Sequence, residues 1–297
     1  MYDNILQSIG DTPLVKINKL NTNPGVEIYA KTEGQNPGGS IKDRVALKMI
    51  EQAEAEGSLT KNKTIIEATS GNTGIALAMI AAVKNYKLLI VMSESVSTER
   101  RKIIKAFGAD IILTPAAGGT DAAILKVKEI CKKNPGKYFT PDQFSNRYNK
   151  IAHYKLTAEE IWKQTNGNID YFVSSVGTSG TIMGVGKALK ENNPKIKIVE
   201  AHPAEGHYIQ GLKNMKEAII PAIYNPEIID KRITVETEDA FKTARKIIAQ
   251  EGIFAGMSSG AAMYAALKIA EETDKGRIVV IFPDRAEKYL STKLFEQ

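Results

Sequence analysis

The chain alternates short apolar runs with amphipathic stretches, and this alternation constrains the fold more than any other feature of the sequence. The apolar runs are rich in Val and Ile, and they are Val26–Lys31, Thr64–Ala68, Leu88–Met92, Asp110–Leu113, Tyr171–Ser174, Lys197–Ala201 and Arg277–Phe282. Several of them are continuously apolar, which is typical of strands buried on both faces of a parallel sheet.

Helical periodicity fills the intervals between these runs. The predicted helices are Lys42–Glu56, Thr73–Lys84, Thr98–Phe107, Thr120–Lys133, Asn149–Gln164, Gly180–Glu191, Thr237–Glu251 and Ser258–Glu271. The alternation predicts an α/β protein with mostly parallel sheets and helices on both faces. With 297 residues, 43% of them hydrophobic, the chain can bury one large core or two modest ones.

Composition excludes several classes of protein. The net charge is +6, but Lys and Glu are interleaved and no basic run alternates with aromatics, so we expect no nucleic-acid partner. Cys131 is the only cysteine, which rules out an intrachain disulfide, and the three histidines lack metal-ligand spacing, so we expect no metal. The sequence shows neither a signal-peptide pattern nor an apolar run that could cross a bilayer. We therefore expect a cytoplasmic protein without a membrane partner.

Two strand-to-helix junctions are rich in Gly, Ser and Thr. Thr69–Gly74 follows the second predicted strand, and Gly177–Thr181 follows the fifth. A helix N-terminus offers free N–H groups and positive dipole, while glycine lets the backbone approach a ligand closely. Each junction is therefore a candidate anion site, although the same residues also cap helices in any protein.

The segment Asn36–Arg44 contains the candidate nucleophile. Its Pro-Gly-Gly predicts a tight turn, Ser40 can cap, and a helix is expected to begin near Lys42. The helix dipole and the nearby Arg44 both disfavour the Lys42 ammonium, which would lower its pKa and favour an amine nucleophile. The alternative is an ordinary solvated lysine.

At this segment the chain resembles the cysteine synthase (O-acetylserine sulfhydrylase) family of pyridoxal-phosphate enzymes, which have the tryptophan-synthase β fold (fold type II). The landmarks span nearly the whole chain, and they are Gly10–Leu14, the Lys42 segment, Thr69–Gly74, Asp142–Phe144, Gly177–Thr181, Gly256–Gly260 and Tyr289–Thr292. The segments with Gln143-Phe144 and Tyr289–Thr292 are closer to the B-type branch of the family than to the A-type. The resemblance implies two domains, a larger one of residues 1–38 and 147–297 and a smaller one of residues 39–146.

The resemblance also implies residue roles. Lys42 would bind pyridoxal 5'-phosphate through its amine and then carry the proton at the substrate Cα. Asn72 would hydrogen-bond the cofactor's ring oxygen, and Ser258 would face its pyridine nitrogen. The cofactor phosphate would lie on Gly177, Thr178, Ser179, Gly180 and Thr181. The substrate carboxylate would be bound by Thr69, Ser70, Gly71, Thr73 and Gln143 as the smaller domain closes.

The implied reaction is a β-replacement that forms L-cysteine from an O-activated serine, with O-acetylserine favoured, and sulfide, through an aminoacrylate. Three alternatives stay open: a phosphoserine-using synthase, an enzyme that takes L-cysteine and releases hydrogen sulfide to give serine or lanthionine, and a catalytically quiet binding homologue. Phosphoserine-using members place an arginine where this chain has Lys213, for which the simpler interpretation is a surface lysine. The resemblance also implies a homodimer. Docking to serine acetyltransferase is a property of A-type members and is not expected here.

Overall fold

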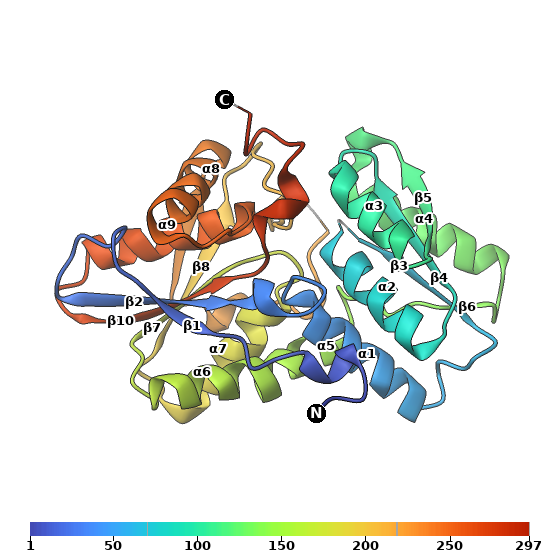
Figure 1. Ribbon diagram of the computed structural model, residues 1–297, viewed down its shortest axis with the longest axis horizontal. Helices are drawn as coiled ribbons and strands as arrows, with labels where there is room; N and C mark the ends of the chain where they lie inside the picture. Colours follow the sequence, from blue (N-terminus) through green and yellow to red (C-terminus); the bar gives the residue numbers. More distant parts are fainter. Residues whose placement is uncertain (70, 218, 297) are drawn as a thin grey trace.

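The computed structural model describes residues 1–69, 71–217 and 219–296, and within them the strands form two separate sheets (Figure 1). The six-stranded sheet has the order β1-β2-β10-β7-β8-β9, and only its β1–β2 pair is antiparallel. Its strands are β1 (Leu14–Ile17), β2 (Val26–Thr32), β7 (Tyr171–Ser175), β8 (Lys197–Pro203), β9 (Lys231–Val235) and β10 (Gly276–Phe282).

The four-stranded sheet is entirely parallel and has the order β5-β4-β3-β6. Its strands are β3 (Thr64–Ala68), β4 (Leu88–Ser93), β5 (Asp110–Thr114) and β6 (Tyr138–Phe139). The mostly parallel α/β architecture is therefore confirmed. The two sheets draw on the two predicted segments of the chain, while the domain boundaries at residues 38 and 146 stay a prediction.

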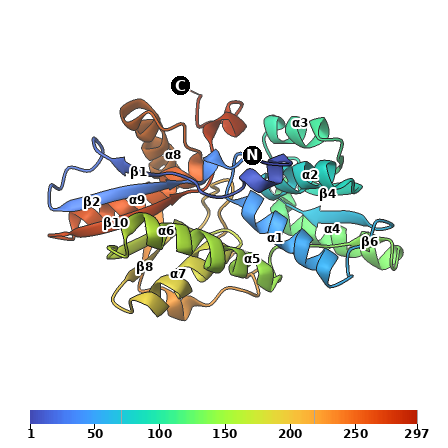
Figure 2. The same ribbon diagram turned by 60° about the horizontal axis from the view of Figure 1, so that its bottom comes forward.

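Helices cover both faces of each sheet. In Figure 1, α8 and α9 lie on one side of the six-stranded sheet and α6 and α7 on the other, and Figure 2 shows the same layers from a second direction. The α-helices are α1 (Lys42–Ala55), α2 (Asn72–Lys84), α3 (Thr98–Ala106), α4 (Gly119–Lys133), α5 (Arg147–Ala152), α6 (Ala158–Thr165), α7 (Gly180–Asn192), α8 (Thr237–Lys246) and α9 (Met257–Glu271). None of the described helices combines the length and the apolar character needed to span a membrane.

The predicted strands match the observed ones to within two residues at each end, but β1, β6 and β9 were missed. All three lie at the edge of a sheet, where one side of the strand has no neighbour. In β9, only Val235 is buried, and the first two residues, Lys231 and Arg232, are charged and at least partly exposed. Edge strands are kept short or charged in natural proteins, so they lack the continuous apolar run on which the prediction relied.

The predicted helix Asn149–Gln164 is divided in the structure. It begins at Arg147, where the Asn146 side chain accepts a hydrogen bond from the Tyr148 N–H (2.9 Å). A π-helical turn, His153–Thr157, then separates α5 from α6. Such turns are frequent at functional sites, and this one lies directly behind α7.

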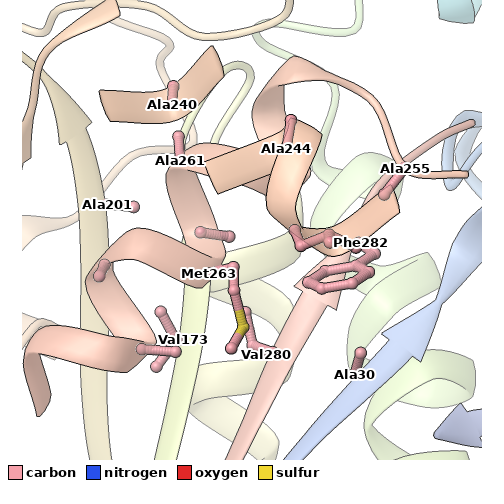
Figure 3. Packing of buried hydrophobic residues seen from close by; sticks show 14 of the residues in the cluster. Ala30, Val173, Ala201, Ala240, Ala244, Ala255, Ala261, Met263, Val280 and Phe282 are labelled. Carbon is pink, nitrogen blue, oxygen red and sulfur yellow. The ribbon is translucent and has the colours of Figure 1, made fainter. Parts of the chain in front are cut away.

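Helix α9 packs against both the six-stranded sheet and α8, and Figure 3 shows Met263 beside Val280 and Ala261 beside Ala240. A Cβ on Gly260 would lie 2.0 Å from the carbonyl oxygen of Ala240, so glycine is needed where α8 crosses α9. This packing fixes the first turn of α9, which carries Ser258.

Candidate active site

A cavity opens between the two sheets, at the carboxyl ends of their central strands. In parallel α/β sheets this edge is where ligands bind, because the loops there lead into helix N-termini. Its lining comes from segments far apart in the sequence, namely Ile41, Lys42, Asn72, Thr73, Thr120, Gln143, Phe144, Ser174, Ser175, Gly177, Thr178, Ser179, Thr181, Tyr208, Gly211, Leu212, Lys213, Ser258 and Pro283. The cavity therefore brings the Lys42 segment and both predicted anion loops together.

Lys42 is the first residue of α1, as predicted, and the Ser40 hydroxyl accepts a hydrogen bond from its main-chain N–H (3.2 Å). Burial lowers the pKa of the Lys42 amine to about 8, against the opposing effects of the Asp284 and Glu33 carboxylates. The predicted direction of this pKa shift is confirmed. Its main cause is desolvation, because a buried ammonium loses its hydration.

The predicted contribution of Arg44 is wrong, because its charge is neutralised. The buried Arg44 guanidinium pairs with Glu33 (2.7 Å) and Glu160 (2.5 Å), and Lys31 completes the cluster by pairing with Glu160 (2.6 Å). These four residues come from β2, the turn that follows it, α1 and α6. The cluster therefore anchors the start of α1, and with it the backbone of Lys42, to the six-stranded sheet.

The loop Gly177–Thr181 has the geometry of an anion cradle. Ser179 has a φ of +68° and directly precedes α7, so the loop turns sharply at the N-terminus of a 13-residue helix. A Cβ on Gly177 would lie 2.2 Å from the carbonyl oxygen of Gly211, and one on Gly180 would lie 1.8 Å from Asn149 Oδ1. The buried Ser179 Oγ has no hydrogen-bond partner among the described residues. The loop thus has a free hydroxyl and helix N–H groups for a phosphate.

The first loop presents Asn72 and Thr73 to the cavity at the start of α2. Asn72 Nδ2 donates to Asp284 Oδ2 (2.7 Å), while its buried Oδ1 has no partner among the residues described. Thr69 and Gly71 are not among the lining residues; the Thr69 hydroxyl instead accepts the Gly71 N–H (3.1 Å). The prediction for Ser70 lies outside the described residues.

Gln143 lies in the cavity beside this loop. Its Oε1 accepts the Thr73 hydroxyl (2.6 Å), and its Nε2 donates to the carbonyl oxygen of Ala68 (3.1 Å). The preceding Asp142 has a φ of +51°, a conformation that costs energy for a residue other than glycine. The buried Glu67 carboxyl holds this turn by accepting the N–H groups of Asp142 (2.8 Å) and Gln143 (3.4 Å).

The structure places in the site residues to which the sequence had assigned no role there. Lys213 is only 10% exposed, so the interpretation as a surface lysine is wrong. Its ammonium pairs with Asp121 (2.7 Å) and lies 4.8 Å from the centre of the Phe144 ring. Phe144 follows Gln143 in a segment that was recognised only as a family landmark. Asn149 was predicted only as the first residue of the helix Asn149–Gln164, and it lies within α5.

A possible cation site lies outside this cavity. Atoms of His207, Glu236 and Glu238 lie within 4.8 Å of one another. However, His207 Nδ1 accepts the Thr237 N–H (3.0 Å) at the start of α8. The histidine therefore acts here as a helix cap.

The residues in the cavity fit a phosphorylated cofactor bound to an amine: Lys42 lies in the same cavity as a phosphate cradle, with the unpaired buried oxygens of Asn72 and Ser179. The family comparison agrees with this geometry. Residues 5–284 match the family described as pyridoxal-phosphate dependent enzyme.

Comparison with individual proteins narrows the class. The chain is 48% identical to a cysteine synthase of Aquifex aeolicus, over 99% of this chain and 92% of the relative, and 43% identical to cysteine synthase B of Escherichia coli, over 97% and 95%. A solved structure of a hydrogen sulfide-producing enzyme from Fusobacterium nucleatum superimposes with a TM-score of 0.93 at 48% identity, covering 98% of this chain and 100% of that one. The chain belongs to the cysteine synthase family of pyridoxal-phosphate-dependent enzymes.

Proposed function

We propose that the protein catalyses β-replacement on an O-activated serine, O-acetylserine in the first place, with sulfide as nucleophile and L-cysteine and acetate as products. The observation that carries this proposal is one cavity that joins the Lys42 amine to two loops suited to anions. One loop suits the cofactor's phosphate and the other the substrate's carboxylate. Together with the family membership, this geometry favours the enzyme over a quiet binding homologue.

In this proposal the bound cofactor supplies an electron-withdrawing ring that acidifies the substrate Cα–H. Lys42 would hold the cofactor until the substrate's amino group displaces it. The freed amine would then take the proton from Cα as acetate leaves Cβ, and return a proton to Cα once sulfide has bonded to Cβ. Gly177–Thr181 bind the phosphate, Asn72 the ring oxygen, and Ser258 faces the ring nitrogen. Thr69, Ser70, Gly71, Thr73 and Gln143 hold the substrate carboxylate. A buried amine with a pKa of about 8 suits both proton transfers near neutral pH.

The ion pair of Lys213 bears on which activated serine is the substrate. Because its ammonium is already paired with Asp121 at 2.7 Å, this lysine is not a free cation for a phosphate group on the substrate. An uncharged acetyl group needs no such cation. We therefore place O-acetylserine before phosphoserine.

A spectral titration tests the proposal. The purified protein should be yellow, and O-acetylserine should shift its absorbance, with cysteine appearing when sulfide is added. Phosphoserine should give a much weaker response. A colourless protein, or a coloured one that ignores O-acetylserine, would refute the proposal.

A second candidate is the release of hydrogen sulfide from L-cysteine, with serine or lanthionine as product. It is favoured by the Fusobacterium nucleatum enzyme, which matches this chain over nearly the full length of both proteins. The two candidates separate when sulfide is measured with L-cysteine as the sole substrate. We further propose a homodimer in the cytoplasm, on the basis of the family resemblance.

A further inference from the structure

Asn149 connects the Gln143 turn to the phosphate cradle Gly177–Thr181. It is 1% exposed and lies on α5, behind the residues that line the cavity. Its Nδ2 group donates one hydrogen bond to the main-chain oxygen of Gln143 (2.7 Å) and another to the Thr178 hydroxyl (3.0 Å). A single amide thus bonds both to the turn that carries Gln143 and to the phosphate cradle.

The orientation of this amide is set by its neighbours. The carbonyl oxygen of Gln143 can only accept, so the NH2 group of Asn149 must face it. The opposite atom, Oδ1, then points at Gly180, where it lies 1.8 Å from the position that a Cβ would occupy. Oδ1 is buried and has no partner among the described residues, which is unfavourable for a carbonyl oxygen. The fold tolerates this loss where the Asn149 amide joins the Gln143 turn to the phosphate cradle.

The other side of the Gln143 turn is held independently. Glu67 accepts the N–H of Gln143, whereas Asn149 binds its carbonyl oxygen. Glu67 lies on β3, in the four-stranded sheet. Its hydrogen bond therefore fixes the Gln143 turn to that sheet and does not link the turn to the phosphate cradle. Among the described residues, Asn149 is the one that bonds to both the Gln143 turn and Thr178.

We propose that Asn149 is a positioning residue that couples the phosphate cradle to the substrate-binding turn, so that a filled cradle sets Gln143 in place for the amino acid. This inference rests on the proposed function. A phosphate that orders the Thr178 hydroxyl also orders the Asn149 amide, and through it the Gln143 backbone. Coupling of this kind is reciprocal, so a bound amino acid should also tighten the cofactor.

The experiment measures the dissociation constant of O-acetylserine, by absorbance, on the enzyme saturated with pyridoxal phosphate. Asn149→Asp keeps the shape of the side chain but removes both donors. It should raise this dissociation constant roughly tenfold or more, with a smaller change in kcat, since losing a buried hydrogen bond has an effect of this order. Thr178→Val should raise it as well, because valine cannot accept from Asn149, whereas Thr178→Ser keeps the acceptor and should stay close to the wild type.

Thr181→Val is the matched control. It removes a hydroxyl from the same cradle, but that hydroxyl pairs with His153 (3.3 Å) instead of Asn149. It should weaken cofactor binding without the rise in the amino acid's dissociation constant. In the double variant Asn149→Asp/Thr178→Val, the second change should add little, because the bond it removes is already lost.

Additive effects in the double variant, or an equal rise in Thr181→Val, would overturn the coupling. If Asn149→Asp does not fold, the question is decided by comparing Thr178→Val, Thr178→Ser and Thr181→Val. If the wild type binds O-acetylserine and the variants bind it equally well, only the role of Asn149 is refuted. A wild type that ignores O-acetylserine would remove the proposed function itself, and this inference with it.

Discussion

Replacing Glu67 by glutamine should change how the stability of the protein depends on pH. Glu67 is 2% exposed, and burial raises the pKa of its carboxyl from 4.5 to about 8, despite the opposing hydrogen bonds from the Asp142 and Gln143 N–H groups. The folded state therefore binds a proton that the unfolded state releases above pH 4.5. The resulting stability is fully present below that pH and is lost as the pH rises through about 8.

The size of the effect follows from the shift of about 3.5 pH units. At roughly 1.4 kcal/mol per unit, the wild type loses up to roughly 5 kcal/mol of unfolding free energy across this range. Glutamine has the same shape, stays neutral, and can still accept the stronger of the two hydrogen bonds. Glu67→Gln should therefore match the wild type within about 1 kcal/mol at pH 5 and become the more stable protein above pH 8.

Urea unfolding of both proteins from pH 5 to pH 9, followed by circular dichroism, measures this difference. A matched control is Glu129→Gln, which removes an exposed carboxyl whose pKa is lowered to about 2 by Lys133 and Lys126. Its folded and unfolded states are both ionised throughout this range, so its profile should run parallel to the wild type. Parallel profiles for Glu67→Gln as well would refute the reasoning.

Three further changes probe the site. Lys42→Ala should abolish the yellow colour due to the lysine–cofactor bond and reduce turnover at least roughly 100-fold, as measured by absorbance and cysteine formation; retained turnover would contradict its role. Gly180→Ala should weaken cofactor binding roughly tenfold, because its Cβ would collide with Asn149, whereas Gly186→Ala in the same helix meets only the Ile198 side chain at 3.3 Å and should not. Ser258→Asp should slow acetate release by roughly tenfold, because a carboxylate would favour a protonated ring nitrogen and a longer-lived carbanion; equal release rates would show this account to be wrong.

The central strands were predictable because both of their faces are buried. Strand β3 begins at Thr64 and ends at Ala68, as expected, and β10 differs from its prediction by a single residue. The edge strands β1, β6 and β9 were not predictable in this way, because they are short or charged, whereas the apolar run of the edge strand β5 was predicted. The anion loops were predictable as helix starts, and the resemblance assigned their ligands.

Contacts between distant segments could not be predicted from the sequence. Asn72 meets Asp284 across 212 residues of chain, and Lys213 meets Asp121 across 92. No local periodicity encodes such pairs, since they depend on how the two sheets pack together. The assignment of Arg44 failed for the same reason: its partner Glu160 lies 116 residues away and cancels the charge that was expected to act on Lys42.

Strands β2 and β10 are parallel neighbours, with Tyr29 aligned to Val279, although they stand near opposite ends of the chain. The four-stranded sheet, by contrast, is complete once Phe139 has been made. On the ribosome, the smaller sheet can therefore assemble while β2 still waits for its partner. Throughout that interval the edge of β2 that will bind β10 has no partner, and an unpaired strand edge can bond to another chain.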